Sequence, residues 1–431
     1  MTWLQYYKEH TVTVEEAVKH VKSGDRIVLG HACGEPQLLP DALVARAAEL
    51  ENVEIVHMVA MGKAPYCRPE FAKSFRHNAI FAGPPTRQAI AEARAVYTPV
   101  YFYQVPALFR DEVLKVDFAF VTVSPPDKFG FVNTGVSVDY TRQAISSARM
   151  VIAEVNPNMP RTAGDSSIKV TDIDCFVPCD MPLVELTPPK IGEVEKAIGS
   201  NIAGLINDGD CLQLGIGAIP DAVLACLGTK KDLGIHSEMI SDGVMNLVEA
   251  NVINCSKKNQ HNGKIVISFA MGTSKFYKWL DNNPMVEVYP VDYVNNPNVA
   301  AGNDNLIAIN SALSVDLLGQ VAADMLGTKQ FSGVGGQVDF VRGAAGSKGG
   351  RSVIALPATA AKGTVSRIDV TLTPGQAVTT SRYDVDYVVT EYGVAALKGK
   401  TNIERAESLI QISAPQFRDE MRQKRIDIYG W

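Results

Sequence analysis

Short apolar runs recur along the first half of the chain, each bounded by residues that favour turns. They lie at residues 26–30, 53–61, 116–123 and 150–155. Runs of this length, separated by segments with apolar residues at helical spacing, predict buried strands that alternate with helices. This alternation is typical of a mostly parallel sheet covered by helices on both faces. The pattern therefore predicts an α/β fold.

The second half shows the same alternation of strands and helices, but it ends in a longer helical segment. Leu212 to Pro220 reads as a buried strand with a tight glycine bend, followed by a helix over 221–227. Tyr387 to Thr390 reads as a further strand. From Thr401 onward the chain is predicted to be helical, with one apolar stripe formed by Ile403, Ala406, Leu409 and Ile410. We expect this helical tail to supply surface for packing and for an interface. On that ground we expect a homodimer.

The two halves also share sequence motifs in the same order. Gly24-Asp25 with Leu29-Gly30 is matched by Gly209-Asp210 with Leu214-Gly215, and Gly135-x-x-Val138-Asp139-Tyr140 is matched by Gly335-x-x-Val338-Asp339-Phe340. Fixed-order repetition of this kind predicts structural repeats. We expect an internal duplication with domains at residues 1–185 and 190–431. The Pro-rich segment 182–190 is typical of the linker between them.

Composition narrows the class of protein. The chain has 431 residues, 46% hydrophobic and 20% charged, with a net charge of −6 spread along its length. That balance argues against nucleic-acid and anionic-membrane partners. No apolar stretch reaches the roughly 18 residues of a membrane helix, and the first ten residues lack a signal-peptide core. Seven scattered cysteines without a Cys-x-x-Cys pair indicate free thiols in a reducing cytoplasm and no metal site.

Glu238 is the main candidate for chemistry. It stands in the segment His236-Ser-Glu-Met-Ile-Ser-Asp-Gly243, at or just past the end of a predicted strand, where ligands gather on α/β sheets. Alignment of the two halves places Val59 opposite Glu238, so only the second half carries this acid. A carboxylate that is ionised, held close and aimed can attack an activated acyl group. We interpret Glu238 as a carboxylate nucleophile.

Two glycine-containing segments and a second acid accompany Glu238. Glycines of the segment 333–336 can turn backbone N–H groups toward one point, as a tetrahedral oxyanion requires. Gly215 and Gly217 let a thin ligand, or another loop, pass close to the backbone. Glu391 ends the strand that begins at Tyr387 and is a candidate for orienting Glu238 or the acyl group, although a surface turn explains it equally well.

Three other interpretations remain open at this point. Gly215-Ile-Gly217 could begin a dinucleotide-binding fingerprint, but Pro220 stands where its third glycine belongs. Serine or cysteine hydrolysis lacks a Gly-x-Ser-x-Gly elbow. A duplicated α/β chain could also be a non-catalytic protein that binds nucleotide-like ligands. The asymmetry between the halves argues against this, because a binding protein has no need of one carboxylate facing one glycine loop.

Taken together, these segments resemble the acetyl-CoA hydrolase/transferase family. The resemblance rests on Leu214-Gly-Ile-Gly-Ala-Ile-Pro220, His236-Ser-Glu-Met-Ile-Ser-Asp-Gly243, Gly333-Val-Gly-Gly-Gln-Val-Asp-Phe340 and Thr390-Glu-Tyr-Gly393, and it runs over nearly the whole chain. It implies two NagB-like open α/β domains. It also implies a transferase that moves CoA between a short-chain acyl-CoA, such as 4-hydroxybutyryl-CoA, and a carboxylic acid such as acetate.

The resemblance further assigns roles to residues. Glu238 is the implied nucleophile, which forms a covalent glutamyl-CoA intermediate in a ping-pong reaction. Contacts to CoA and the oxyanion are implied for Gly215, Ile216, Gly217, Ala218, Ile219, Gly335 and Gly336, and an acyl-orienting role, less directly, for Glu391. CoA is then a substrate, and no cofactor or metal is implied. Butyryl-CoA:acetate transfer and short-chain acyl-CoA hydrolysis are the alternatives within the family.

Overall fold

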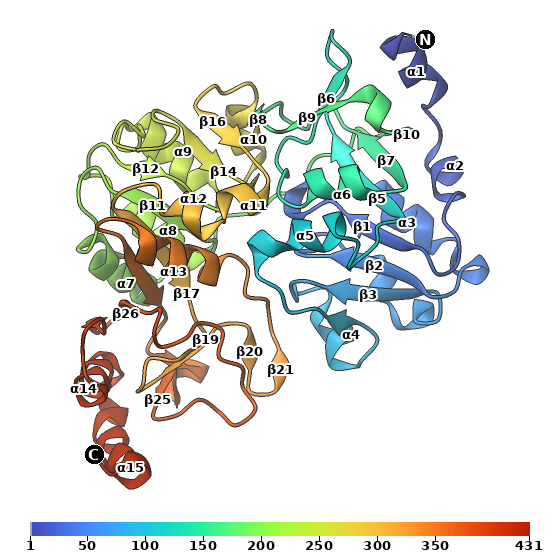
Figure 1. Ribbon diagram of the computed structural model, residues 1–431. Coiled ribbons are helices and arrows are strands. Elements are labelled where there is room, and N and C mark those ends of the chain that lie inside the picture. Colours follow the sequence, from blue (N-terminus) through green and yellow to red (C-terminus); the bar gives the residue numbers. More distant parts are fainter. Residues whose placement is uncertain (1) are drawn as a thin grey trace. The chain divides into compact units, whose positions relative to one another are not determined.

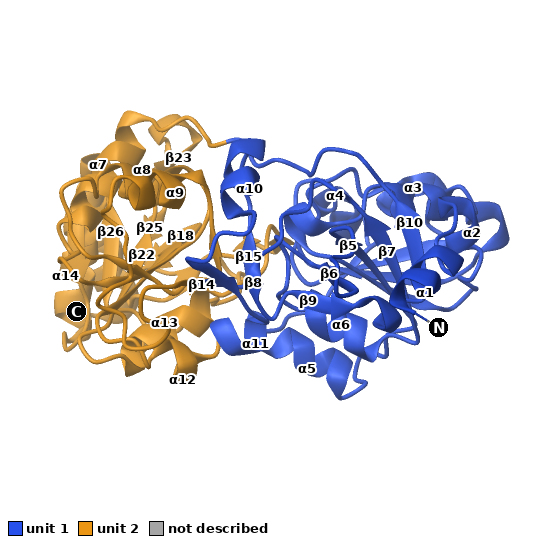
Figure 2. Ribbon diagram, turned by 90° about the horizontal axis from the view of Figure 1, so that it is seen from above, with its two compact units in different colours: residues 1–187, 266–294 blue, residues 188–265, 295–431 orange. Residues whose placement is uncertain are grey.

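The computed structural model describes residues 2–431, which form two compact units (Figure 2). Unit 1 comprises the chain up to Thr187 together with Val266–Val294, and unit 2 comprises Pro188–Ile265 and Asn295–Trp431. The change from one unit to the other at residue 187 lies inside the predicted linker.

Unit 1 is built on a seven-stranded sheet in which every neighbouring pair of strands is parallel. Its strands, in spatial order, are β10 (Cys175–Pro178), β7 (Met150–Val155), β5 (Phe118–Val123), β1 (Arg26–Leu29), β2 (Val53–His57), β3 (Phe75–Ala79) and β4 (Val96–Tyr97). Its helices before the linker are α1 (Trp3–Glu9), α2 (Val14–Val18), α3 (Leu38–Val44), α4 (Arg87–Ala91), α5 (Val105–Arg110) and α6 (Thr141–Ser147). The predicted parallel α/β fold is confirmed for this unit.

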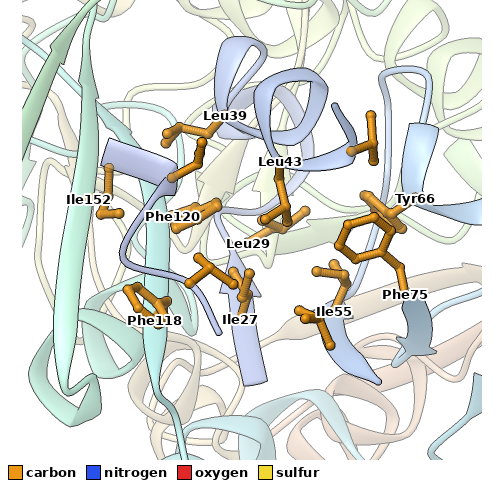
Figure 3. Packing of buried hydrophobic residues seen from close by; sticks show 14 of the residues in the cluster. Ile27, Leu29, Leu39, Leu43, Ile55, Tyr66, Phe75, Phe118, Phe120 and Ile152 are labelled. Atoms are coloured by element: carbon orange, nitrogen blue, oxygen red, sulfur yellow. The ribbon is translucent and has the colours of Figure 1, made fainter. Parts of the chain in front are cut away.

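Alternate residues of the central strands pack beneath α3 in unit 1 (Figure 3). Ile27 and Leu29 of β1 are fully or almost fully buried against Leu39 and Leu43 of α3. The cluster also contains Phe118, Phe120, Ile55 and Ile152 from the neighbouring strands. Burial of each such side chain stabilises the fold by about 1.5–3 kcal/mol. The core thereby fixes the strand ends, where polar loops emerge.

Unit 2 contains a six-stranded sheet, parallel except at its last pair. In spatial order the strands are β12 (Gly234–Ile235), β11 (Cys211–Leu214), β17 (Leu306–Ser311), β22 (Arg351–Ala355), β26 (Tyr387–Thr390) and β27 (Gly393–Ala396). The helices are α7 (Glu193–Ala203), α8 (Ala218–Ala225), α9 (Asp242–Glu249), α12 (Pro297–Ala300), α13 (Gln337–Gly346), α14 (Asn402–Ile412) and α15 (Arg418–Tyr429), as labelled in part in Figure 1.

Five strands follow one another in the same spatial order in both units. The order β2-β1-β5-β7-β10 in unit 1 corresponds to β12-β11-β17-β22-β26 in unit 2. The repeated motif also recurs in a similar place, because Gly135 precedes α6 and Gly335 precedes α13, each with a positive φ. These similarities are what an internal duplication would produce. The duplication itself stays a prediction.

The segment Val266–Val294 belongs to unit 1, whereas the sequence-based division placed all residues from 190 onward in one domain. Hydrogen bonds explain the difference. The amides of Val138 and Asp139 both donate to Ser268 O, and β16 (Val286–Val288) pairs with β8 (Ala163–Gly164). This segment also contains β15 (Phe269–Ala270), α10 (Ser274–Leu280) and α11 (Val291–Val294). Backbone pairing across a long sequence separation leaves no local pattern in the sequence.

The C-terminal end is helical, as predicted, in α14 and α15. Ala406, Leu409 and Ile410 are fully buried, but Ile403 is 53% exposed, so the predicted stripe is wrong at its first member. Ile403 lies in the first turn, just after the Thr401 cap, where the helix has not yet reached the core.

All seven cysteines are free. Within the described part of the chain, every helix is too short or too polar to traverse a bilayer.

Candidate active site

Glu238 follows the edge strand of the unit 2 sheet, at the end where the parallel strands finish. β12 pairs with β11 through Leu212 and Ile235, and His236 N donates to Leu212 O. Ser237 then continues the pairing with its side chain, because its Oγ donates to Leu214 O (3.0 Å) and accepts from Leu214 N (3.2 Å). Ser237 is buried and Glu238, the next residue, is partly exposed. The backbone that carries the carboxylate is thus fixed from one side.

Asn295 fixes the carboxylate itself. Its Nδ2 donates to Glu238 Oε2 at 2.7 Å and lies 3.3 Å from Asp339 Oδ2. Asn295 is fully buried, directly before Asn296, whose side chain caps α12. A hydrogen bond from a neutral amide to a carboxylate is charge-assisted and therefore directional. Asn295 therefore orients the carboxylate of Glu238, whose role as a nucleophile stays a prediction.

The N-terminus of α13 meets the same carboxylate. Gly336 is the N-cap residue of this helix, and a Cβ atom built there would overlap Glu238 Oε2 and crowd Asn295 Nδ2. Gly335, with a φ of +53°, turns the chain into the helix. Unpaired N–H groups and a partial positive charge lie at a helix N-terminus. This is the environment that a developing oxyanion requires, and the role predicted for Gly335 and Gly336 remains a prediction.

The glycine segment after β11 is open on its outer side. A Cβ at Gly215 or Gly217 would meet no atom within 4 Å, and Ile216 is 43% exposed. Gly217 has a φ of +117°, which disfavours every residue with a side chain. The predicted helix starts earlier than expected, at Ala218, so Ala218 and Ile219 belong to the first turn of α8 rather than to a loop. Bare backbone beside β12 suits a ligand that passes close to the chain.

Glu391 accepts a hydrogen bond from the loop that follows the neighbouring strand, β22. Its Oε2 accepts a hydrogen bond of 2.8 Å from Ala358 N, just past the end of β22. Three strands lie between β26 and β12, so Glu391 and Glu238 emerge at separate places along the sheet edge. The contact assigns Glu391 to holding the loop after β22. The predicted acyl-orienting role stays untested.

Sequence reasoning missed Asn295 and gave no role to Asp339, although Asp339 lies in the quoted repeat. The signals were weak: Asn295-Asn296-Pro297 reads as a turn, and the aspartate is shared with Asp139 of unit 1. In unit 1 that aspartate instead accepts from Ser137 Oγ and lies 3.2 Å from His31 Nδ1.

Among residues 2–431, no group of three His, Cys, Asp or Glu side chains is arranged to hold a metal ion.

Comparison with known proteins gives consistent results over the whole chain. The acetyl-CoA hydrolase/transferase N-terminal domain matches residues 2–186, and the C-terminal domain of that family matches residues 272–425. The 4-hydroxybutyrate coenzyme A transferase of Clostridium kluyveri is 59% identical, covering 98% of each chain. A succinyl-CoA:cyclohexane-1-carboxylate CoA transferase of Geobacter metallireducens is 45% identical, covering 97% of this chain and 95% of that one.

A solved structure agrees with these sequence matches. The crystal structure of 4-hydroxybutyrate CoA-transferase from Porphyromonas gingivalis superposes with a TM-score of 0.85 at 41% identity, covering 98% of this chain and 99% of that one. The protein is therefore an enzyme of the CoA-transferase kind and belongs to the acetyl-CoA hydrolase/transferase family.

Proposed function

We propose that this enzyme transfers CoA between 4-hydroxybutyryl-CoA, or a similar short-chain acyl-CoA, and a carboxylic acid such as acetate, through a glutamyl-CoA thioester on Glu238. The observation that supports this proposal most directly is the arrangement around Glu238: one carboxylate oxygen is held by Asn295 at 2.7 Å, at the N-terminus of α13. The choice of substrate follows the C. kluyveri relative, which is a 4-hydroxybutyrate coenzyme A transferase. CoA acts as a substrate, and the proposal includes no resident cofactor.

The first half-reaction begins with the carboxylate of Glu238, one oxygen of which acts as the nucleophile. That oxygen attacks the thioester carbonyl of the acyl-CoA, and the resulting oxyanion expels CoA as a thiolate. The product is a mixed anhydride between the acyl group and Glu238. The thiolate then attacks the Glu238 carbonyl carbon, and the C–O bond of the anhydride breaks. The acyl group leaves as a free carboxylate, and Glu238 is left as a thioester of CoA.

The second half-reaction reverses these steps with another acid. Its carboxylate attacks the glutamyl-CoA carbonyl and releases the thiolate, which then attacks the acyl side of the new anhydride. A new acyl-CoA leaves and the Glu238 carboxylate is restored. One thioester replaces another, so the chemistry needs no external source of energy. The protein's tasks are to hold the anhydride in line with the thiolate and to exclude water.

The intermediate can be tested directly by intact-protein mass spectrometry. The protein is incubated with 4-hydroxybutyryl-CoA without an acceptor acid, and the peptide that contains Glu238 is then mapped. We expect an added mass of CoA less one water on that peptide, removed by acetate. The variant Glu238→Gln should show no adduct. The matched control Glu249→Gln, which alters an exposed carboxylate at the end of α9, should behave as wild type.

Other outcomes have clear meanings. Steady release of CoA without an adduct would replace the proposal with acyl-CoA hydrolysis. An adduct on another carboxylate would overturn the assignment of Glu238. An adduct formed with butyryl-CoA but not with 4-hydroxybutyryl-CoA would keep the mechanism and change the substrate.

A further inference from the structure

A hairpin follows β22 in unit 2 and carries two cations. Its strands are β23 (Thr359–Ala360) and β24 (Val365–Ser366), which pair antiparallel. Lys362 lies at its tip, with a φ of +56°, and Arg367 lies at its base. The nine residues from Thr359 to Arg367 include three hydroxyl side chains and no acid. The hairpin is thus locally positive without an acidic neighbour in its own sequence.

Arg367 stands out because its side chain has no ion-pair or hydrogen-bond partner among residues 2–431. Its Nε is buried without a hydrogen-bond partner, and its guanidinium makes no ion pair with another residue that the structure describes. Burial alone lowers the pKa of this guanidinium. By contrast, the partly buried Arg351 of the same unit is paired with Asp210. The side chain is half-buried, so part of its charge is withdrawn from water, and a bound anion would offset the cost of that desolvation.

The position of Arg367 relates it to the active site. Arg367 N donates to Ala358 O, and Ala358 N donates to Glu391, so this residue lies at the same edge of the sheet as Glu238. β22 is separated from β12 by β11 and β17. Three strand spacings of about 4.8 Å separate the end of β22 from the end of β12 by roughly 14 Å along the edge. That is too far for contact with the reacting carbonyl, but the extended pantetheine arm of CoA, which separates the sulfur from the phosphates, can span a distance of this size.

Accepting the proposed function, we infer that Arg367 binds a phosphate group of the ADP portion of CoA, with exposed Lys362 as a second cation. The planar guanidinium fork matches two phosphate oxygens at once, which a lysine cannot do. Arg367 is a binding residue and takes no part in the bond changes at Glu238. Its contribution should therefore depend on whether the substrate carries phosphate.

The test compares Arg367→Gln with wild type on three thioesters of the same acid. Acyl-CoA carries all the phosphates, acyl-dephospho-CoA lacks the 3′-phosphate, and acyl-pantetheine carries none. We expect kcat/KM for acyl-CoA to fall about 10- to 100-fold, as for the loss of a charged hydrogen bond, with kcat nearly unchanged. For acyl-pantetheine the variant and wild type should be equal. The control Arg422→Gln removes an arginine that is paired on the C-terminal helices and should match wild type throughout.

The pattern across substrates decides the outcome. An equal loss for acyl-CoA and acyl-dephospho-CoA would assign Arg367 to the diphosphate, and a loss for acyl-CoA alone would assign it to the 3′-phosphate. A loss that persists with acyl-pantetheine, or no loss at all, would overturn the inference. Arg367→Lys should recover only part of the affinity.

A binding measurement separates this inference from the proposed function. Titration calorimetry with CoA needs no turnover, and the dissociation constant of Arg367→Gln should rise by the same 10- to 100-fold. If wild type binds CoA in this way but forms no glutamyl adduct, the catalytic proposal fails and the phosphate site stands. If adduct formation is normal while the variant binds CoA as wild type does, the phosphate site fails and the catalytic proposal stands.

Discussion

Asn295 donates from Nδ2 to Glu238 Oε2 at 2.7 Å, and its own Oδ1 is buried with no hydrogen-bond partner within residues 2–431. The amide is therefore turned so that its donor faces two carboxylates, those of Glu238 and Asp339. Under the proposed mechanism Asn295 is a positioning residue, because it acts on the substrate through Glu238.

Replacing Asn295 should separate positioning from binding. In Asn295→Ala the carboxylate loses its directional partner, and a shift of about 1 Å costs on the order of a hundredfold. We expect kcat to fall about 10- to 100-fold while KM for the acyl-CoA changes little. Asn298→Ala, at an exposed position in the next helix, is the control. A rise in KM with kcat preserved would contradict the positioning role.

The length of the Glu238 side chain should affect the rate of transfer as much as its charge does. Glu238→Asp keeps the carboxylate but withdraws it by one methylene from the bound acyl group and from Asn295. We expect at least a hundredfold loss in the rate of adduct formation, measured in single-turnover mass spectrometry. Glu238→Gln should form no adduct. Transfer that survives in Glu238→Gln would refute the covalent mechanism.

Gly336 should tolerate no side chain. In Gly336→Ala the new methyl group would occupy the place of Glu238 Oε2, so the carboxylate must rotate away. We expect transferase activity to fall more than about a hundredfold, as for other misplaced reacting groups. Gly228→Ala is the matched control, because its Cβ would meet no atom within 4 Å. Equal activity in the two variants would show that the carboxylate is not held against the helix.

Glu35 in unit 1 should make stability depend on pH. Burial raises the pKa of this carboxyl to about 8, from an ordinary 4.5, and hydrogen bonds from Met61 N and Gly62 N lower it only in part. Between these values the folded protein holds a proton that the unfolded chain has lost. The Glu35 contribution to the free energy of unfolding is therefore full below about pH 4.5 and is lost as pH rises through 8.

The variant Glu35→Gln isolates this contribution. The difference in Tm between wild type and variant should change in the variant's favour from pH 5 to pH 8. His57, whose Nε2 lies 3.5 Å from Glu35 Oε2, has a pKa that burial lowers well below 6.5, so it titrates in the opposite sense. It is present in both proteins and largely cancels in the difference. A pH-independent difference would show that Glu35 keeps the same charge in the folded and unfolded states.

Local patterns predicted much of this structure. β7 and β26 have the predicted bounds, and β1 and β5 differ from the prediction by one or two residues. These strands could be predicted because buried strands and the turn residues that bound them are recognisable from short stretches of sequence. Glu238 was found for the same reason, as an acid just past a strand. Asn295 could not be found in this way. It approaches Glu238 across 57 positions of sequence, and the two meet where α12 packs against α13, whose N-terminal Gly336 lies beside the Glu238 carboxylate.

The contact between Gly336 and Glu238 limits how this enzyme can change its choice of acid. Bare backbone at the start of α13 and the Glu238 carboxylate occupy adjoining space, so a side chain at position 336 would displace the carboxylate. A library randomised at position 336 should return glycine alone among active clones. Selection for new substrates must then act on residues that contact the acyl group, while this pair is inherited unchanged.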